Sequence, residues 1–322
     1  MTSNDKRELR VGQMTWEAEG VLSVRLTDPD GAELPSWEPG SHLALHLPGG
    51  IVREFSLCSD PEDRSGWTVA VLREPSSRGG SAYVHLELRP GDVIEVEGPR
   101  NNFPLEQADE YVLVAGGIGI TPILAMAREL ERRGASWRML YAGRSGRTMA
   151  FVDQLRQLGA DRIRVHADDE AGGPPALVDE LGSIGATTLV YCCGPEPLLQ
   201  GVEAALPDPG RLRLERFKAP EPIAPPPGGD QPFDIVCSGS GRRVGVPVGV
   251  TALDALSQAG FDVPSSCTEG ICGTCETKVL AGKVDHRDFL LSDDEKEAQD
   301  TMFICVSRAL TPELTLDVTE PA

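Results

Sequence analysis

The stretch CTEGICGTC, residues 267–275, contains Cys267, Cys272 and Cys275, and one distant cysteine, Cys305, follows it. The pattern C-x4-C-x2-C with a later single cysteine is the plant-type spacing of ligands to a [2Fe–2S] cluster. The two glycines of the stretch permit the backbone angles with which a tight loop turns its amide hydrogens toward the cluster sulfurs. We therefore predict that these four cysteines bind a [2Fe–2S] cluster.

Two other roles for these thiols fit less well. A structural zinc site takes two short pairs of ligands, whereas Cys305 stands alone. Disulfides form in oxidising compartments, and the first residues, MTSNDKRELR, lack the apolar core of a signal peptide. We expect a reducing, cytoplasmic location. The four cysteines outside the pattern are Cys58, Cys192, Cys193 and Cys237.

Length and charge restrict the class of protein. A chain of 322 residues is expected to form two or three domains. Its 50 acidic and 30 basic residues give a net charge of -20, which repels nucleic acid and anionic membranes and favours a basic protein partner. The most apolar stretch, YVLVAGGIGITPILAM, is broken by Gly and Pro and is too short to cross a bilayer.

The pattern of strand-like and helical runs divides the chain into three predicted folded segments. Residues 1–105 hold short strand-like runs such as SHLALHLP, whose alternation predicts a half-buried strand in a small closed β-barrel. Residues 106–217 alternate strands with helical runs, as a parallel α/β domain does. Residues 218–232 contain six prolines and form a predicted linker. Residues 233–322 are a third unit of short strands and helices.

Helix starts are visible in the third unit. Thr251 precedes Asp254 by three residues, and Ser292 precedes Glu295 by the same spacing. A Ser or Thr followed three residues later by an acidic residue is typical of a capped helix N-terminus. We therefore predict helices that begin at these two positions.

A glycine-rich turn in the second segment indicates a dinucleotide site. VLVAGGIGITP ends a strand and opens a helix, with Thr121 as the predicted N-cap. Gly117 and its neighbouring glycines would let the backbone approach a pyrophosphate. YCCGPEPLL repeats this layout after a later strand. Ordinary β–α turns remain an alternative, and Arg144 and Arg147 leave the choice between NADH and NADPH open.

A group that separates paired electrons is needed between the two centres. A nicotinamide releases two electrons together and a [2Fe–2S] cluster accepts one, and a flavin can separate them. In VREFSL, Arg53 and Phe55 lie about 7 Å apart on one face of a strand and suit a phosphate and a flavin ring, while Ser56 points the other way. SSRGGSAY supplies a predicted phosphate nest from Arg78, Gly79, Gly80 and Ser81.

The chain resembles the phthalate dioxygenase reductase family, which includes vanillate demethylase reductases. The motifs that carry the resemblance are REFSLCSDP, SRGGS, GPRNNFPL, AGGIGITP, YCCGP, LERF, VPSSCTEGICGTC, DHRDFLL and ICVSRA, in family order. The resemblance implies a flavin-binding β-barrel, a nucleotide-binding α/β domain and a C-terminal α+β ferredoxin domain of the β-grasp type.

The resemblance also implies residue roles. FMN would be held by Arg53, Phe55 and Ser56, with Gly79, Gly80 and Ser81 near its phosphate. The family usually has Tyr where this chain has Phe55. The implied dinucleotide residues are Gly117, Thr121, Cys193, Gly194 and Pro195. Phe217 would pack near the flavin face, and with Ser56 it completes the expected catalytic pair.

The implied activity is electron transfer from NADH or NADPH through FMN and the [2Fe–2S] cluster to an oxygenase, expected to be of the Rieske type and to act on an aromatic or small organic acid. We expect a monomer. Rival interpretations are a reductase for a haem monooxygenase, a free-standing NADH oxidase or ferric reductase, and a redox sensor.

Overall fold

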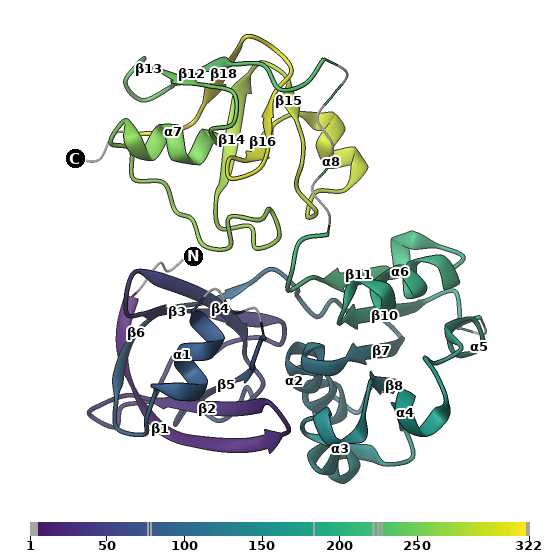
Figure 1. Cartoon of the computed structure of the whole chain (residues 1–322). Coiled ribbons are helices and arrows are strands. Elements are labelled where there is room, and N and C mark those ends of the chain that lie inside the picture. Colours follow the sequence, from purple (N-terminus) through teal and green to yellow (C-terminus); the bar gives the residue numbers. More distant parts are fainter. Residues whose placement is uncertain are drawn as a thin grey trace. The chain divides into compact units, whose positions relative to one another are not determined.

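The computed structural model describes residues 6–75, 77, 79–182, 184–220, 223, 226 and 228–319. The chain divides into two compact units, Met1–Phe217 and Lys218–Ala322, which are described separately (Figure 1). The boundary at residue 105 and the extent of the linker at 218–232 stay predictions, and part of that linker lies outside the described residues. Within the described part of the chain, no helix is long and apolar enough to cross a membrane.

The N-terminal part of the first unit is a β-barrel, as predicted. Its six strands pair in the order β4-β3-β6-β1-β2-β5. A bridge between Leu57 and Val69 joins the two edge strands and closes the sheet. The elements are β1 (Lys6–Ala18), β2 (Val21–Thr27), β3 (Ser41–Leu47), β4 (Ile51–Ser56), β5 (Trp67–Leu72), α1 (Gly80–Leu86) and β6 (Val93–Asn101).

Strand β3 differs from the half-buried strand that its alternation predicts. Leu43 and Leu45 are fully buried in the barrel core. On the opposite face, however, His42 is only 7% exposed and Ala44 only 3%. The periodic pattern identifies the core face correctly, but it carries no information on what covers the other face.

The second half of this unit is a parallel α/β sheet in the order β11-β10-β7-β8-β9. Strand β7 supplies core residues to both faces, because Leu113 packs with one helical layer and Val112 with the other. The elements are β7 (Glu110–Gly116), η1 (Gly117–Gly119), α2 (Ile120–Arg132), β8 (Ser136–Gly143), η2 (Gly146–Thr148), α3 (Val152–Gly159), β9 (Ile163–Ala167), α4 (Asp168–Ala171), α5 (Leu177–Leu181), β10 (Thr188–Cys193), α6 (Glu196–Ala205), η3 (Pro209–Arg211) and β11 (Leu212–Glu215).

The start of α2 corrects one prediction. Thr121 is not the N-cap, because the 3-10 turn at Gly117–Gly119 leads directly into a helix that begins at Ile120. The hydroxyl of Thr121 instead donates to the Ile118 carbonyl at 3.0 Å. A Thr–Pro pair is typical of a helix start, but here the preceding turn already supplies helical backbone.

The second unit combines a five-stranded mixed sheet, in the order β13-β12-β18-β14-β16, with a small β15-β17 pair. Both predicted caps are confirmed: the Thr251 side chain accepts from the Asp254 amide, and Ser292 with Glu295 forms a complete capping box. The elements are β12 (Phe233–Cys237), β13 (Arg243–Val246), α7 (Ala252–Gln258), β14 (Glu276–Ala281), β15 (Val284–Asp285), α8 (Asp293–Ala298), β16 (Thr301–Phe303), β17 (Arg308–Ala309) and β18 (Glu313–Leu316).

Candidate functional site

The glycines of the β7–α2 turn have different structural tasks. A Cβ on Gly119 would lie 2.2 Å from the Cys193 carbonyl oxygen, and one on Gly116 would lie 3.3 Å from the Cα of Gly194. Protein packing therefore requires these two glycines, because the β7 and β10 turns touch backbone to backbone. Gly117 differs, since it has a φ of +52° and a Cβ placed on it would meet no described protein atom within 4 Å.

The carbonyl of Gly117 is held in place by the Tyr141 hydroxyl, at 3.2 Å. The backbone at Gly117 is thus fixed and open on its Cβ side, which suits the approach of a dinucleotide. Thr121, the other predicted residue of this turn, is only 1% exposed. Its hydroxyl is already used within the protein, so any part it has in nucleotide binding is carried by the backbone around it.

The end of β10 lies beside this turn. Cys193 pairs with Ala115 of β7 on one side and with Glu215 of β11 on the other. Gly194 then contacts the glycine turn, and Pro195 is the residue before α6. Three of the predicted dinucleotide residues therefore lie at the carboxyl ends of parallel strands, which is where open α/β sheets bind ligands.

Strand β4 brings the predicted flavin residues together with the start of α1. A Cβ on Gly80 would lie 2.5 Å from Cγ of Arg53, so the arginine side chain runs directly over this glycine. Gly79 has a φ of +97° and lies against Ile51. The Ser81 hydroxyl accepts from the Glu74 amide at 3.2 Å. The arginine, both glycines and the serine thus gather at one end of α1.

Arg78, which belongs to the same predicted nest, lies outside the described residues. Phe55 is partly buried and packs against the barrel core. Phe217, the last residue of the first unit, is 40% exposed. An exposed aromatic ring at this position is accessible to a ligand.

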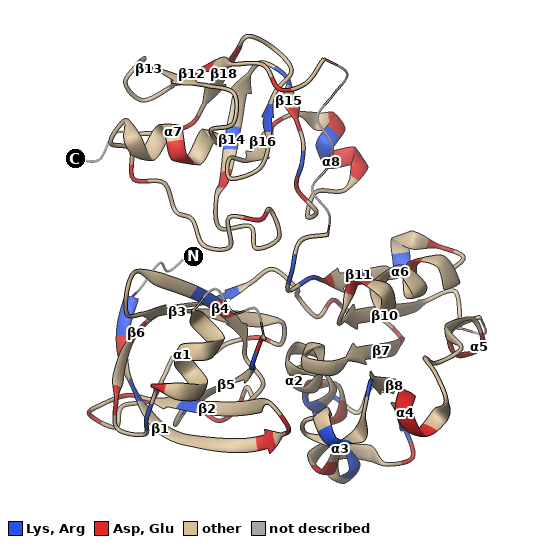
Figure 2. Ribbon diagram, viewed as in Figure 1, with Lys and Arg blue, Asp and Glu red and all other residues tan. Residues whose placement is uncertain are grey.

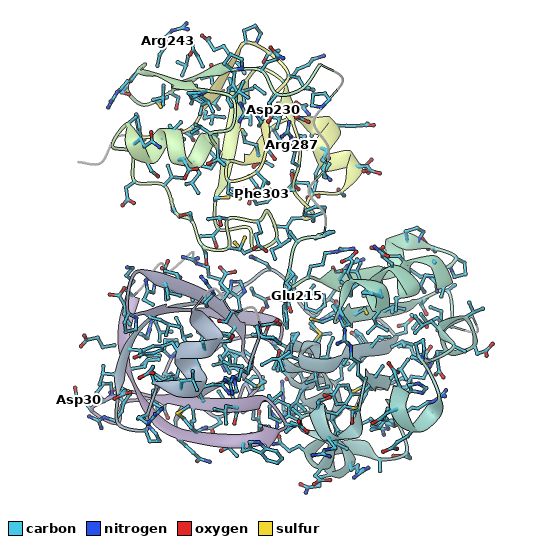
Figure 3. The ribbon with its side chains drawn as sticks, viewed as in Figure 1. Asp30, Glu215, Asp230, Arg243, Arg287 and Phe303 are labelled. Carbon is cyan, nitrogen blue, oxygen red and sulfur yellow. The ribbon has the colours of Figure 1, made fainter. Side chains whose placement is uncertain are left out.

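Glu215 is a site residue that the sequence did not reveal. Its Oε2 atom lies 3.5 Å from the Ser56 hydroxyl and 3.7 Å from Sγ of Cys193, so a carboxyl from β11 joins β4 to β10. Figure 3 labels Glu215 within the first unit. Burial, the largest cause, raises the pKa of Glu215 to about 8, with a further rise from the charge of Glu54. A single Glu in the run LERF gives no signal of this contact, because the contact depends on how the barrel packs against the parallel sheet within the first unit.

The cysteine loop has the local geometry that a metal cluster needs. Cys267 is partly exposed, and the other three cysteines of the quartet are buried. The Glu269 amide donates to Sγ of Cys267 at 3.3 Å. The side chains of Cys275 and Cys305 hydrogen-bond to each other, which lowers the pKa of Cys275 and raises that of Cys305. The contact places the Cys275 and Cys305 thiols side by side.

The four thiols of the quartet are the donor set of a [2Fe–2S] cluster, which is usually held by four cysteine thiolates. Among the described residues, no group of three or more His, Cys, Asp or Glu side chains converges closely enough to bind a single metal ion. Each of the eight cysteines is a thiol, and none forms a disulfide.

Comparisons with known protein families agree with this division. Residues 113–204 match the family model described as an oxidoreductase NAD-binding domain. Residues 235–310 match the model described as a 2Fe-2S iron-sulfur cluster binding domain. The first match contains the glycine turn and the end of β10, and the second contains all four cysteines of the quartet.

Some known proteins are similar to this chain over nearly its whole length. The phenoxybenzoate dioxygenase subunit beta of Ectopseudomonas oleovorans is 45% identical over 96% of this chain and 97% of its own length. The solved structure of a phthalate dioxygenase reductase, described as modular for electron transfer from pyridine nucleotides to [2Fe–2S], is 36% identical, with a TM-score of 0.71 over 97% of this chain and 98% of that one.

A third similarity is to part of a larger protein. An intact type IV self-sufficient cytochrome P450 monooxygenase is 42% identical, with a TM-score of 0.89 over 97% of this chain. This chain spans only 41% of that protein's length. The similarity therefore concerns the fold of that part, and the activity of the whole P450 protein does not transfer to this chain.

Proposed function

This chain belongs to the phthalate dioxygenase reductase family, and from this membership we propose which of its residues carry electrons toward an oxygenase. It is an NAD(P)H-dependent electron-transfer reductase of an oxygenase system, with FMN and a [2Fe–2S] cluster as cofactors. The observation that carries the assignment of residues is the contact of Ser56, Glu215 and Cys193, because it joins the flavin strand to the ends of the nucleotide strands.

We assign FMN binding to β4 and the turn before α1. When bound, FMN accepts a hydride from the nicotinamide and releases electrons one at a time. Arg53 supplies the positive charge for the phosphate, since a charge-assisted hydrogen bond is about twice as strong as a neutral one. Phe55 offers a ring face for stacking. The hydroxyl of Ser56 orients the edge of the flavin, and Gly79, Gly80 and Ser81 surround the phosphate.

We assign the nicotinamide dinucleotide to the turns after β7 and β10. Gly117 offers open, fixed backbone, and Thr121 anchors the turn behind it. Cys193, Gly194 and Pro195 form the opposing wall. Phe217 covers the place that the nicotinamide enters and must move aside for it. The Ser56 hydroxyl and the Glu215 carboxyl then lie beside the reacting groups, and Glu215 holds a proton at neutral pH.

We assign the cluster to Cys267, Cys272, Cys275 and Cys305. When bound, such a cluster accepts one electron and passes it on. The tether between the two units keeps the cysteine unit at a high, roughly millimolar effective concentration near the flavin. The same tether leaves this unit able to reach an external acceptor.

The acceptor that we propose is a Rieske-type oxygenase. From residue 231 onward the chain has 15 acidic and 7 basic residues, a net charge of -8. Acidic side chains occupy most of α8 (Figure 2). A surface of this charge attracts a basic patch on a partner and raises the rate of encounter. We further propose that the chain acts as a monomer, which sedimentation of the purified protein would test, and that it lies in the cytoplasm, which cell fractionation would test.

One observation favours a second acceptor. The fold matches part of a self-sufficient P450 protein more closely, with a TM-score of 0.89, than it matches the phthalate enzyme, with 0.71. A haem monooxygenase is therefore the alternative partner. Purified reductase, mixed separately with a Rieske oxygenase and with a P450 protein, distinguishes the two by substrate turnover per NADH consumed.

The donor and the cofactor content are tested by anaerobic titration. Stepwise addition of NADH or NADPH, followed by visible spectra, counts the electrons that the protein stores and identifies the preferred donor. We expect three electrons per chain, two on the flavin and one on the cluster. Colourless protein, or protein that contains zinc without iron, contradicts the proposal.

A further inference from the structure

The segment that follows β15 lies directly against the cysteine loop. The Phe289 amide donates to the Gly270 carbonyl at 3.1 Å. Gly270 has a φ of +72°, and a Cβ there would lie 2.7 Å from Cγ2 of Val306 and 3.2 Å from Cα of Asp288. The neighbouring Glu269 amide in turn donates to Sγ of Cys267 at 3.3 Å. The position of Gly270, and thus a hydrogen bond to a cluster ligand, depends on how this segment is held.

Asp288 holds the segment from within. Its side chain is completely buried. Its Oδ2 atom accepts from the Leu291 amide at 2.9 Å and from the Leu290 amide at 3.3 Å, which closes a turn immediately after Phe289. Lys296, on α8, donates to the Asp288 carbonyl at 3.3 Å. Side chain and backbone of one residue therefore fix the turn that presents the Phe289 amide.

The other oxygen of Asp288 faces a histidine. Oδ1 lies 3.6 Å from Nδ1 of His286, and neither this oxygen nor either ring nitrogen has a hydrogen-bond partner among the described residues. The intervening Arg287 points elsewhere, to Asp230 at 2.5 Å and Asp285 at 2.6 Å (Figure 3). Burying a carboxylate costs free energy unless its oxygens accept hydrogen bonds. Packing alone therefore does not explain a carboxylate at position 288.

We propose that Asp288 is a positioning residue for the iron–sulfur centre. Through Leu290, Leu291 and the Phe289–Gly270 hydrogen bond it holds Gly270, and with it the Glu269 amide that donates to Sγ of Cys267. Amide hydrogen bonds to ligand sulfurs tune the potential and the retention of a cluster. This inference rests on the proposed function, because it needs the four cysteines to hold a cluster.

Two variants at this position test the proposal in the full-length, cluster-loaded protein. Asp288→Ala removes the acceptor for both leucine amides. Asp288→Asn keeps an oxygen for those amides and turns an N–H toward His286. Asp317→Ala is the matched control, because Asp317 is an exposed acid of the same unit that accepts from Ser238 at 3.1 Å. The readouts are iron release to a chelator, the midpoint potential and the EPR spectrum of the reduced centre.

We expect Asp288→Ala to release iron at least tenfold faster than wild type and to shift both the potential and the EPR signal. Asp288→Asn and Asp317→Ala should stay within twofold of wild type. The proposal is overturned if Asp288→Ala matches wild type, or if Asp288→Asn loses iron at least tenfold faster than wild type. If Asp288→Ala fails to fold, Asp288→Leu takes its place, because leucine fills a similar volume and accepts no hydrogen bond; it should release iron at least tenfold faster than wild type, and wild-type retention in this variant overturns the proposal. A wild-type protein without iron contradicts the proposed function itself, which is a different result.

Discussion

The Ser56 hydroxyl lies 3.5 Å from the Glu215 carboxylate, although Ser56 ends a strand of the barrel and Glu215 ends a strand of the parallel sheet. Cys193 contacts the same carboxylate from the neighbouring strand. Because burial raises the pKa of Glu215 to about 8, this carboxyl keeps its proton at pH 7. A proton is therefore stored where the two halves of the first unit meet.

The raised pKa makes the stability of the first unit depend on pH. The folded state holds a proton on Glu215 up to about pH 8, whereas the unfolded chain releases it near pH 4.3. The contribution of Glu215 to the free energy of unfolding is complete below pH 4. It is lost as the pH rises to 8, by at most about 1.4 kcal/mol per pH unit. Glu215→Gln should remove this loss.

Tryptophan fluorescence during urea unfolding measures this effect, because all four tryptophans lie in the first unit. The stability of Glu215→Gln relative to wild type should increase between pH 5 and pH 8. Glu87→Gln, an exposed change in the same unit, serves as the control and should leave the pH profile unaltered. Parallel pH profiles for wild type and Glu215→Gln would show that Glu215 does not titrate in this range.

The fold was largely predictable because its signals are local. Alternation in SHLALHLP, the glycine turn after β7 and the cap at Ser292 each depend on neighbours in the chain. The position of Glu215 was not predictable, since it depends on how the barrel packs against the parallel sheet. The roles of Gly116 and Gly119 were also hidden, because the sequence carries no sign that the Cys193 turn packs against them.

Arg53→Ala should weaken FMN binding. Loss of one charge-assisted hydrogen bond costs about 1.5–3 kcal/mol, which corresponds to a roughly 10- to 150-fold higher dissociation constant. Flavin fluorescence on dilution measures the release. Arg10→Ala, which changes an exposed arginine on β1, should bind FMN like wild type. Full flavin occupancy of Arg53→Ala at high dilution would show that Arg53 does not bind the phosphate.

Cys272→Ser should abolish cytochrome c reduction and leave flavin reduction by NADH intact. The reason is that the cysteine quartet belongs to the second unit, whereas Ser56 and the glycine turn belong to the first. Stopped-flow absorbance follows the two steps separately. Cys237→Ser is the control, because Cys237 is a buried thiol of the same unit outside the quartet. Simultaneous loss of both steps in Cys272→Ser would contradict the separation of tasks between the units.

Alanine at Gly119 and alanine at Gly117, two glycines of one turn, should have different effects. In Gly119→Ala the new methyl group meets the Cys193 carbonyl oxygen at 2.2 Å, and because backbone must shift, we expect the first unit to lose about 3 kcal/mol of stability. In Gly117→Ala the methyl group meets no described protein atom within 4 Å. The cost is then limited to the left-handed backbone, about 1 kcal/mol.

The two variants also separate packing from ligand binding. Gly117→Ala places its methyl group where we propose that the dinucleotide approaches, so its KM for NADH should rise about tenfold, as expected for a loss of about 1.4 kcal/mol of binding energy. Urea unfolding and steady-state kinetics measure the two effects in the same preparations. If Gly117→Ala keeps the wild-type KM while Gly119→Ala is destabilised, the turn serves only to pack β7 against β10, and the dinucleotide must bind elsewhere.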